Sequence, residues 1–135
     1  MKNIVVSAAI IIRINPKTHK KELFATQRSY GEFEGFWELP GGKLENGETA
    51  EQCIVREIDE ELQTEIVAKQ TLGIVEYDYP NFHLCMHCII CQIVKGELKL
   101  SEHNDFKWLT KENLFSLNWL PADKLILKEI EKLLV

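Results

Sequence analysis

The sequence predicts an α/β protein in which a mixed sheet lies between helices. Three observations lead to this fold class. Apolar runs bounded by turn residues occupy the start of the chain and the segment 66–94, which is typical of strands. Between them, apolar residues recur every four positions over 50–62, as on one face of a helix. Pro121 then begins a second helical pattern near the C-terminal end.

The first elements are expected to be two strands, Ile4–Ile14 and Glu22–Arg28, joined by a turn at Asn15–Thr18. The first run follows a lysine and could be taken for a signal peptide. It is short, however, and no small-residue cleavage site follows it, so we interpret it as a buried strand. A loop over Ser29–Phe36 then leads to Pro40-Gly41-Gly42.

The remaining elements follow in order after the helix over 50–62. Two strands, Ile66–Tyr79 and His83–Val94, are expected to pair around Pro80-Asn81, and a short strand covers Phe106–Leu109, before a helical turn at residues 110–113. The last helix should begin at Pro121 and turn four apolar side chains inward: Leu125, Ile126, Ile130 and Leu133. At 135 residues the whole chain, 1–135, is expected to be one domain.

Three carboxylates follow the i, i+3, i+4 spacing of one helix face: Glu57, Glu60 and Glu61. Such like charges repel one another by a few tenths of a kcal/mol per pair. The stripe could be a solvated acidic face. Beside a glycine loop, it also offers the oxygen ligands that Mg²⁺ prefers when it is shared with substrate phosphates.

The span from Gly42 to Glu61 resembles the box of the Nudix family, Gly-x5-Glu-x7-Arg-Glu-apolar-x-Glu-Glu-x-Gly-apolar. Every charged position is present. Two trailing positions depart, because Gln63 stands in place of glycine and Thr64 in place of an apolar residue. The glycine allows a left-handed helix end, which costs another residue about 1–2 kcal/mol. Either Gln63 adopts that conformation or the helix ends differently.

The resemblance implies the Nudix α/β/α sandwich and a hydrolase that uses Mg²⁺, with Mn²⁺ as a substitute. Glu57 or a loop acid, Glu102, would take the proton from the attacking water. Arg56 points away from the apolar face and would buttress the acids or the preceding loop. The resemblance implies five metal ligands: the Gly42 carbonyl, Glu57, Glu60, Glu61 and Glu102.

Within the family the chain is similar to the MutT branch, which converts nucleoside triphosphates to monophosphates and pyrophosphate, and to its members that act on CTP or damaged nucleotides. By this resemblance Arg28 and Lys43 would bind phosphates, Tyr79 would flank the base, and Asp123 would recognise it. An ionised carboxylate only accepts hydrogen bonds, so Asp123 should favour cytosine or guanine over uracil and thymine.

Each of these assignments has a structural alternative. Arg28 and Glu102 could be solvated loop charges, and Asp123 could be an acid in the first turn of a helix. For the whole protein, the alternatives are a Nudix hydrolase of another nucleoside diphosphate derivative and a Nudix-shaped module that binds nucleotides without cleaving them. The complete set of box carboxylates favours an enzyme.

Composition narrows the choice of partners. The net charge of −5 disfavours coating of a nucleic-acid polymer and contact with a membrane through a basic patch. No apolar segment approaches the length that spans a bilayer, so a cytoplasmic location is expected. A small-molecule nucleotide is the expected partner, and the protein is expected to be a monomer or a weak homodimer.

Three cysteines, Cys85, Cys88 and Cys91, form a Cys-x2-Cys-x2-Cys run that could suggest a metal site. Such sites use loops, whereas this run lies in a predicted strand. On a strand Cys88 faces away from the other two, which would lie about 20 Å apart. We therefore expect these residues to be small buried hydrophobes.

Overall fold

The computed structural model describes residues 1–98 and 105–135. Its elements, in order, are β1 (Lys2–Ile14), β2 (Lys21–Gln27), β3 (Trp37–Glu38), β4 (Gly41–Lys43), α1 (Ala50–Leu62), β5 (Glu65–Tyr79), β6 (Phe82–Lys95), β7 (Asp105–Leu109), a 3₁₀ turn η1 (Leu114–Ser116), α2 (Pro121–Lys124) and α3 (Leu127–Leu133). The strands and helices agree with the predicted order, apart from the last helix and from the short strands β3 and β4, which were not predicted. No helix among the described residues is long and apolar enough to cross a membrane.

The sheet is mixed, as predicted. Its order is β3-β2-β1-β6-β5, with β4 paired to β1 and β7 paired to β2. Strands β1 and β6 run parallel, and the other strand pairs are antiparallel. The long β1 strand therefore lies at the centre, where it pairs with three neighbours.

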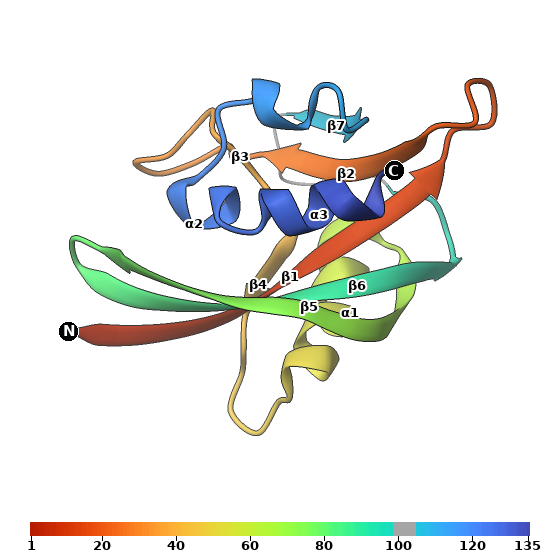
Figure 1. Ribbon diagram of the computed structural model, residues 1–135. Helices are drawn as coiled ribbons and strands as arrows, with labels where there is room; N and C mark the ends of the chain where they lie inside the picture. Colours follow the sequence, from red (N-terminus) through yellow and green to blue (C-terminus); the bar gives the residue numbers. More distant parts are fainter. Residues whose placement is uncertain (99–104) are drawn as a thin grey trace.

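Helices cover both faces of this sheet (Figure 1). On one face α1 packs Ile54, Ile58 and Leu62 onto Ile11 and Ile89. On the other face α2 and α3 close a larger cluster of buried residues that includes Ala122, Leu127 and Ile130, together with Trp119. This arrangement confirms the predicted sandwich, and residues from the middle of β1, from β4, from the end of α1 and from the start of α2 line one cavity.

The C-terminal helix differs from the prediction. It is split into α2 and α3, and Leu125 between them is 56% exposed, so the assignment of Leu125 to the inner face was wrong. The amides of Leu125 and Ile126 bond to carbonyls three residues back, which tightens the helix and rotates its faces. Ile126 and Ile130 are buried as predicted, with Leu127 in the place expected for Leu125.

Gln63 ends α1 in the left-handed conformation, at φ 52° and ψ 40°. The first of the two expected alternatives therefore holds: glutamine adopts the backbone geometry that the family gives to glycine. Next to it, Thr64 is fully buried, and its hydroxyl lies 2.9 Å from the carbonyl oxygens of Leu62 and Glu97. This side chain satisfies a helix-end carbonyl and ties α1 to the turn that follows β6.

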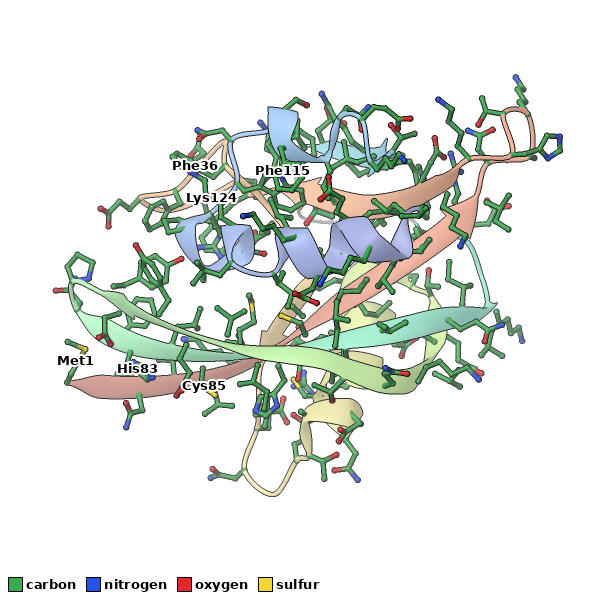
Figure 2. The ribbon with its side chains drawn as sticks, in the orientation of Figure 1. Met1, Phe36, His83, Cys85, Phe115 and Lys124 are labelled. Carbon is green, nitrogen blue, oxygen red and sulfur yellow. The ribbon has the colours of Figure 1, made fainter. Side chains whose placement is uncertain are left out.

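The cysteines occupy β6 as strand residues. Cys88 is buried in the cluster beneath α2 and α3, whereas Cys91 is buried beneath α1. Figure 2 shows Cys85 and His83 on the side of the sheet away from α2 and α3. The thiols of Cys85, Cys88 and Cys91 are free, and burial raises the pKa of Cys88 and Cys91 to about 12. These observations confirm the strand interpretation, whereas the expected burial holds for Cys88 and Cys91 and not for Cys85, which is only partly buried.

Candidate active site

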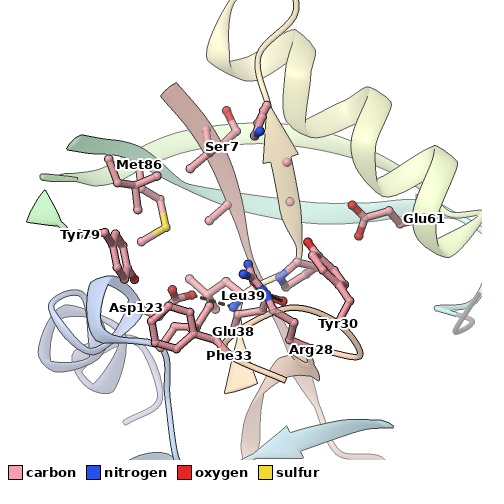
Figure 3. Close-up of a pocket in the computed structure, with 18 of the residues that line it drawn as sticks. Ser7, Arg28, Tyr30, Phe33, Glu38, Leu39, Glu61, Tyr79, Met86 and Asp123 are labelled. Carbon is pink, nitrogen blue, oxygen red and sulfur yellow. Dashed lines mark hydrogen bonds and ion pairs between the residues drawn. The ribbon is translucent and has the colours of Figure 1, made fainter. Parts of the chain in front are cut away.

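A cavity of about 380 Å³ opens between the centre of the sheet, the loop at 29–36 and the start of α2. Its size is that of a small-molecule site. Figure 3 shows Glu61 on one side, Tyr79 and Asp123 on the opposite side, and Arg28 with Tyr30 between them. The cavity thus joins one end of the acidic helix face to the predicted base-recognition residue.

The start of α1 is fixed by a capping box. The Thr49 hydroxyl accepts from the amide of Gln52, and the Gln52 side chain accepts from the amide of Thr49. The turn before it has Gly47 at φ 82°, a backbone conformation that favours glycine. The capping box and this turn fix the backbone at the start of α1, and with it the positions of the carboxylates that the helix carries.

Arg56 connects this turn to the acidic face. Its Nε and Nη2 donate to both oxygens of Glu48, and Nη1 donates to Glu57 at 2.8 Å and Glu60 at 3.2 Å. Hydrogen bonds from Arg56 and from the amide of Glu45 hold the pKa of Glu48 at about 2. One guanidinium therefore offsets the repulsion among the acids and binds the loop to the helix, which is the buttressing role expected for Arg56.

Glu57 packs directly over Gly42. A methyl group built on the Gly42 α-carbon would lie within 2.6 Å of both carboxylate oxygens of Glu57. The Glu57 side chain is only 15% exposed. Beneath it, Cys53 is fully buried with its Sγ 3.5 Å from the Gly42 and Lys43 carbonyl oxygens. Any larger residue at position 42 would collide with the Glu57 carboxylate, so this position requires glycine.

The predicted metal ligands of the box lie along β4 and α1 with different exposures, and among the residues that the structure describes no group of three or more acidic, histidine or cysteine side chains is arranged to hold a metal ion. Glu57 is largely covered, the Glu60 side chain is 57% exposed, and Glu61 lines the cavity together with Gly42. Glu102 lies outside the described residues. Carboxylate and carbonyl oxygens form a hard donor set, so by their chemistry these residues suit a divalent cation such as Mg²⁺ or Mn²⁺.

Glu38 was not identified as a candidate from the sequence. It holds Arg28 through two hydrogen bonds, Nε to Oε2 at 3.1 Å and Nη2 to Oε1 at 2.7 Å. The ring of Tyr30 lies 5.2 Å from the Arg28 guanidinium. All three residues line the cavity. The sequence signal was an acidic residue shortly before a glycine pair. The partner of Glu38 is set only by the pairing of β2 with β3.

Asp123 lines the cavity although it is only 4% exposed. Its Oδ2 accepts from the amide of Leu39 at 2.9 Å. Burial raises the pKa of Asp123 to about 7, and the Leu39 hydrogen bond only partly offsets this effect. The carboxyl group is therefore poised to titrate near neutral pH while it faces the cavity.

Aromatic rings form the wall beside Asp123. The Tyr79 ring contacts Phe82 at 5.0 Å and Phe33 at 5.7 Å between centroids, and its hydroxyl accepts from the amide of Ala122 at 3.2 Å. Tyr79 therefore lines the cavity beside Asp123, with its hydroxyl already engaged. Phe33, in the loop at 29–36, was not identified from the sequence because loop residues carry no periodicity.

Comparison with known proteins places the chain in a family. A model of the NUDIX domain matches residues 5–130. The chain is 41% identical over 64 residues to 8-oxo-dGTP diphosphatase of Proteus vulgaris, over 47% of this chain and 57% of that protein. It is 31% identical over 123 residues to CTP pyrophosphohydrolase of Escherichia coli, over 91% of this chain and 87% of that protein.

The solved structures agree with this placement. The solution structure of the E. coli ORF135 protein matches with a TM-score of 0.81 at 29% identity, over 98% of this chain and 91% of that chain. The chain spans little more than half the length of the Proteus relative, but 87% of the E. coli CTP pyrophosphohydrolase and 91% of the ORF135 chain. The chain therefore belongs to the NUDIX family and is a hydrolase of the MutT type, which acts on phosphoanhydride bonds.

Proposed function

We propose that this chain, as a single domain over 1–135, is a Mg²⁺-dependent nucleoside triphosphate pyrophosphohydrolase. It would release a nucleoside monophosphate and pyrophosphate, with CTP, dCTP or oxidised guanine nucleotides preferred. One observation carries the proposal: a single cavity is lined by Glu61 and Gly42 of the box and by Asp123 with its aromatic wall. The names of the Proteus and E. coli relatives support the same substrate class.

Nudix hydrolases generally need a divalent metal. The residues that would hold Mg²⁺ are the Gly42 carbonyl, Glu57, Glu60 and Glu61, with Glu102 from the loop. When bound, Mg²⁺ would neutralise phosphate charge and lower the pKa of a water.

Side chains of the protein would position the acids, accept the proton and bind the phosphates. Arg56 keeps Glu57 in place through its Nη1. Glu57 or Glu102 would accept the proton of the attacking water, because a carboxylate is a competent general base when it lies within reach. Lys43 is exposed at the cavity and would bind a phosphate oxygen.

Arg28 would bind phosphate from the middle of the cavity. Glu38 engages two of the five guanidinium N–H groups, so others can reach an oxygen of the substrate. The Glu38 pair also fixes the plane of the guanidinium, which suits recognition of a phosphate by two parallel hydrogen bonds.

A panel of nucleotides tests the proposal. With Mg²⁺, the protein should release pyrophosphate and the monophosphate from CTP, dCTP and 8-oxo-dGTP faster than from UTP or dTTP, and chelation should abolish release. Nucleoside diphosphates linked to sugars serve as the comparison arm. Faster cleavage of these compounds would favour another Nudix hydrolase, and binding without release of pyrophosphate would favour a nucleotide-binding module.

Substitution of Asp123 should change the choice of base. Asp123→Ala is expected to erase most of the preference for cytosine or guanine nucleotides while sparing the metal chemistry, because a site built around a buried hydrogen bond discriminates strongly. Asp123→Asn retains an acceptor for the Leu39 amide and controls for loss of folding. The measurement is the ratio of kcat/KM for CTP and UTP.

The same ratio should depend on pH. Above a pKa of about 7 the Asp123 carboxylate is ionised and only accepts hydrogen bonds, so the preference should be strongest there. Below it the protonated carboxyl also donates, which should admit uracil and thymine. If Asp123→Ala leaves the ranking of substrates unchanged, Asp123 does not recognise the base and is only an acid in the first turn of α2.

A further inference from the structure

Helix α2, which carries Asp123, has no cap of its own. It is four residues long, its N-cap residue Leu120 has no side-chain acceptor, and Pro121 has no amide hydrogen. The amide of Ala122 is the first donor of this turn, and Ala122 is fully buried. A buried N–H group without an acceptor is strongly unfavourable, so another element must supply one.

The β5–β6 hairpin supplies that acceptor through Tyr79. The Tyr79 hydroxyl accepts from the Ala122 amide at 3.2 Å, across 43 positions of sequence. The Tyr79 ring is 8% exposed and is packed against Tyr77 at 4.7 Å and Phe82 at 5.0 Å, both from the same hairpin. The hairpin therefore holds the ring that presents this hydroxyl to α2.

Asp123 follows Ala122 directly and is held from a second direction by the Leu39 amide. We propose that Tyr79 is a positioning residue for Asp123: its hydroxyl caps α2 from the hairpin and thereby sets the base selectivity of the cavity. This inference rests on the proposed function, in which Asp123 recognises the base. It gives Tyr79 a role through its hydroxyl, beyond that of an aromatic ring beside the base.

If the Tyr79 hydroxyl acts through Asp123, its removal should change KM and kcat differently. Loss of the cap should loosen the base end of the cavity and leave the carboxylates of α1 unchanged. The KM for the preferred nucleotide should therefore rise, while kcat at saturation stays within about twofold. A ring that only stacks on the base would keep its contribution in phenylalanine, which has the same face.

The test is Tyr79→Phe, with Tyr77→Phe as the matched control. Tyr77 is the neighbouring ring on the same strand and does not line the cavity. In Tyr79→Phe the ratio of kcat/KM for CTP and UTP should fall about five- to tenfold, as expected for the loss of one buried hydrogen bond. Tyr77→Phe should leave the ratio within about twofold, and circular dichroism should show the same fold in both variants.

A double-mutant cycle separates positioning from a general loss of packing. In an Asp123→Asn background, Tyr79→Phe should change the ratio no further, because the residue through which it acts is already altered. An unchanged ratio in Tyr79→Phe alone would overturn the inference, and so would an equal fall in the Asp123→Asn background.

An NMR titration of the Asp123 carboxyl carbon makes the test independent of activity. Tyr79→Phe should shift the titration midpoint, and Tyr77→Phe should not. If the wild-type protein hydrolyses no nucleotide, the proposed function fails, and this titration alone decides whether Tyr79 positions Asp123. An unshifted midpoint in Tyr79→Phe would then contradict the positioning role.

Discussion

Glu57→Gln should lower kcat by on the order of 10³-fold while the fold stays intact, because it removes one negative charge from the proposed metal-binding oxygens. Glutamine has the shape of glutamate and still presents an oxygen to Arg56, which donates to Glu57 at 2.8 Å. It also fits over Gly42. The loss of activity should therefore come from the missing charge and not from unfolding, and the melting temperature should change by only a few degrees.

The measurement is kcat at saturating Mg²⁺, together with Mn²⁺ binding followed by electron paramagnetic resonance. Asp59→Asn is the matched control, because Asp59 is an exposed acid of the same helix. It removes the same charge from α1 and should leave both readouts near wild type. Near-normal turnover in Glu57→Gln would contradict the proposed role of Glu57.

Gly42→Ala should reduce kcat/KM by about 10²-fold, because displacement of a reacting group by about 1 Å can have an effect of this size. The added methyl group would overlap the Glu57 carboxylate, within 2.6 Å of both oxygens. Gly42 is not among the glycines with positive φ, so alanine brings no backbone strain. The variant therefore displaces Glu57 without removing a charge.

The control for this prediction is Gly42→Ala combined with Glu57→Gln. If the methyl group acts by moving Glu57, the double variant should be little worse than Glu57→Gln alone. If the fold-losses in kcat/KM of the two single variants multiply in the double variant, Gly42→Ala acts elsewhere, for example through the Gly42 carbonyl. Thermal melting should show both variants folded.

Several features of this protein follow from the sequence by itself. The helix was predicted from the apolar spacing over 50–62, because such spacing is a local signal, and α1 covers Ala50–Leu62. The strand character of the cysteine run and the burial of the first apolar run were predicted for the same reason. The sequence also placed the carboxylates of the helix beside a glycine loop, and in the structure Gly42 lies against Glu57.

Other features depend on the tertiary structure. Leu125 faces outward because two hydrogen bonds tighten the end of α2, an effect that helical periodicity cannot show. The pairing of Glu38 with Arg28 follows from the register of β2 with β3. The position of the Glu57 carboxylate over Gly42 depends on the packing of α1 against β4.

The base end of the cavity shows the physical reason for this division. The Leu39 amide and Asp123 are 84 positions apart, and Tyr79 and Ala122 are 43 apart. Local patterns specify which face of an element is apolar, since they depend on spacing along one backbone. The raised pKa of Asp123 and the capping of α2 by Tyr79 arise only when the sheet, the hairpin and α2 exclude water together, and so only the folded chain decides them.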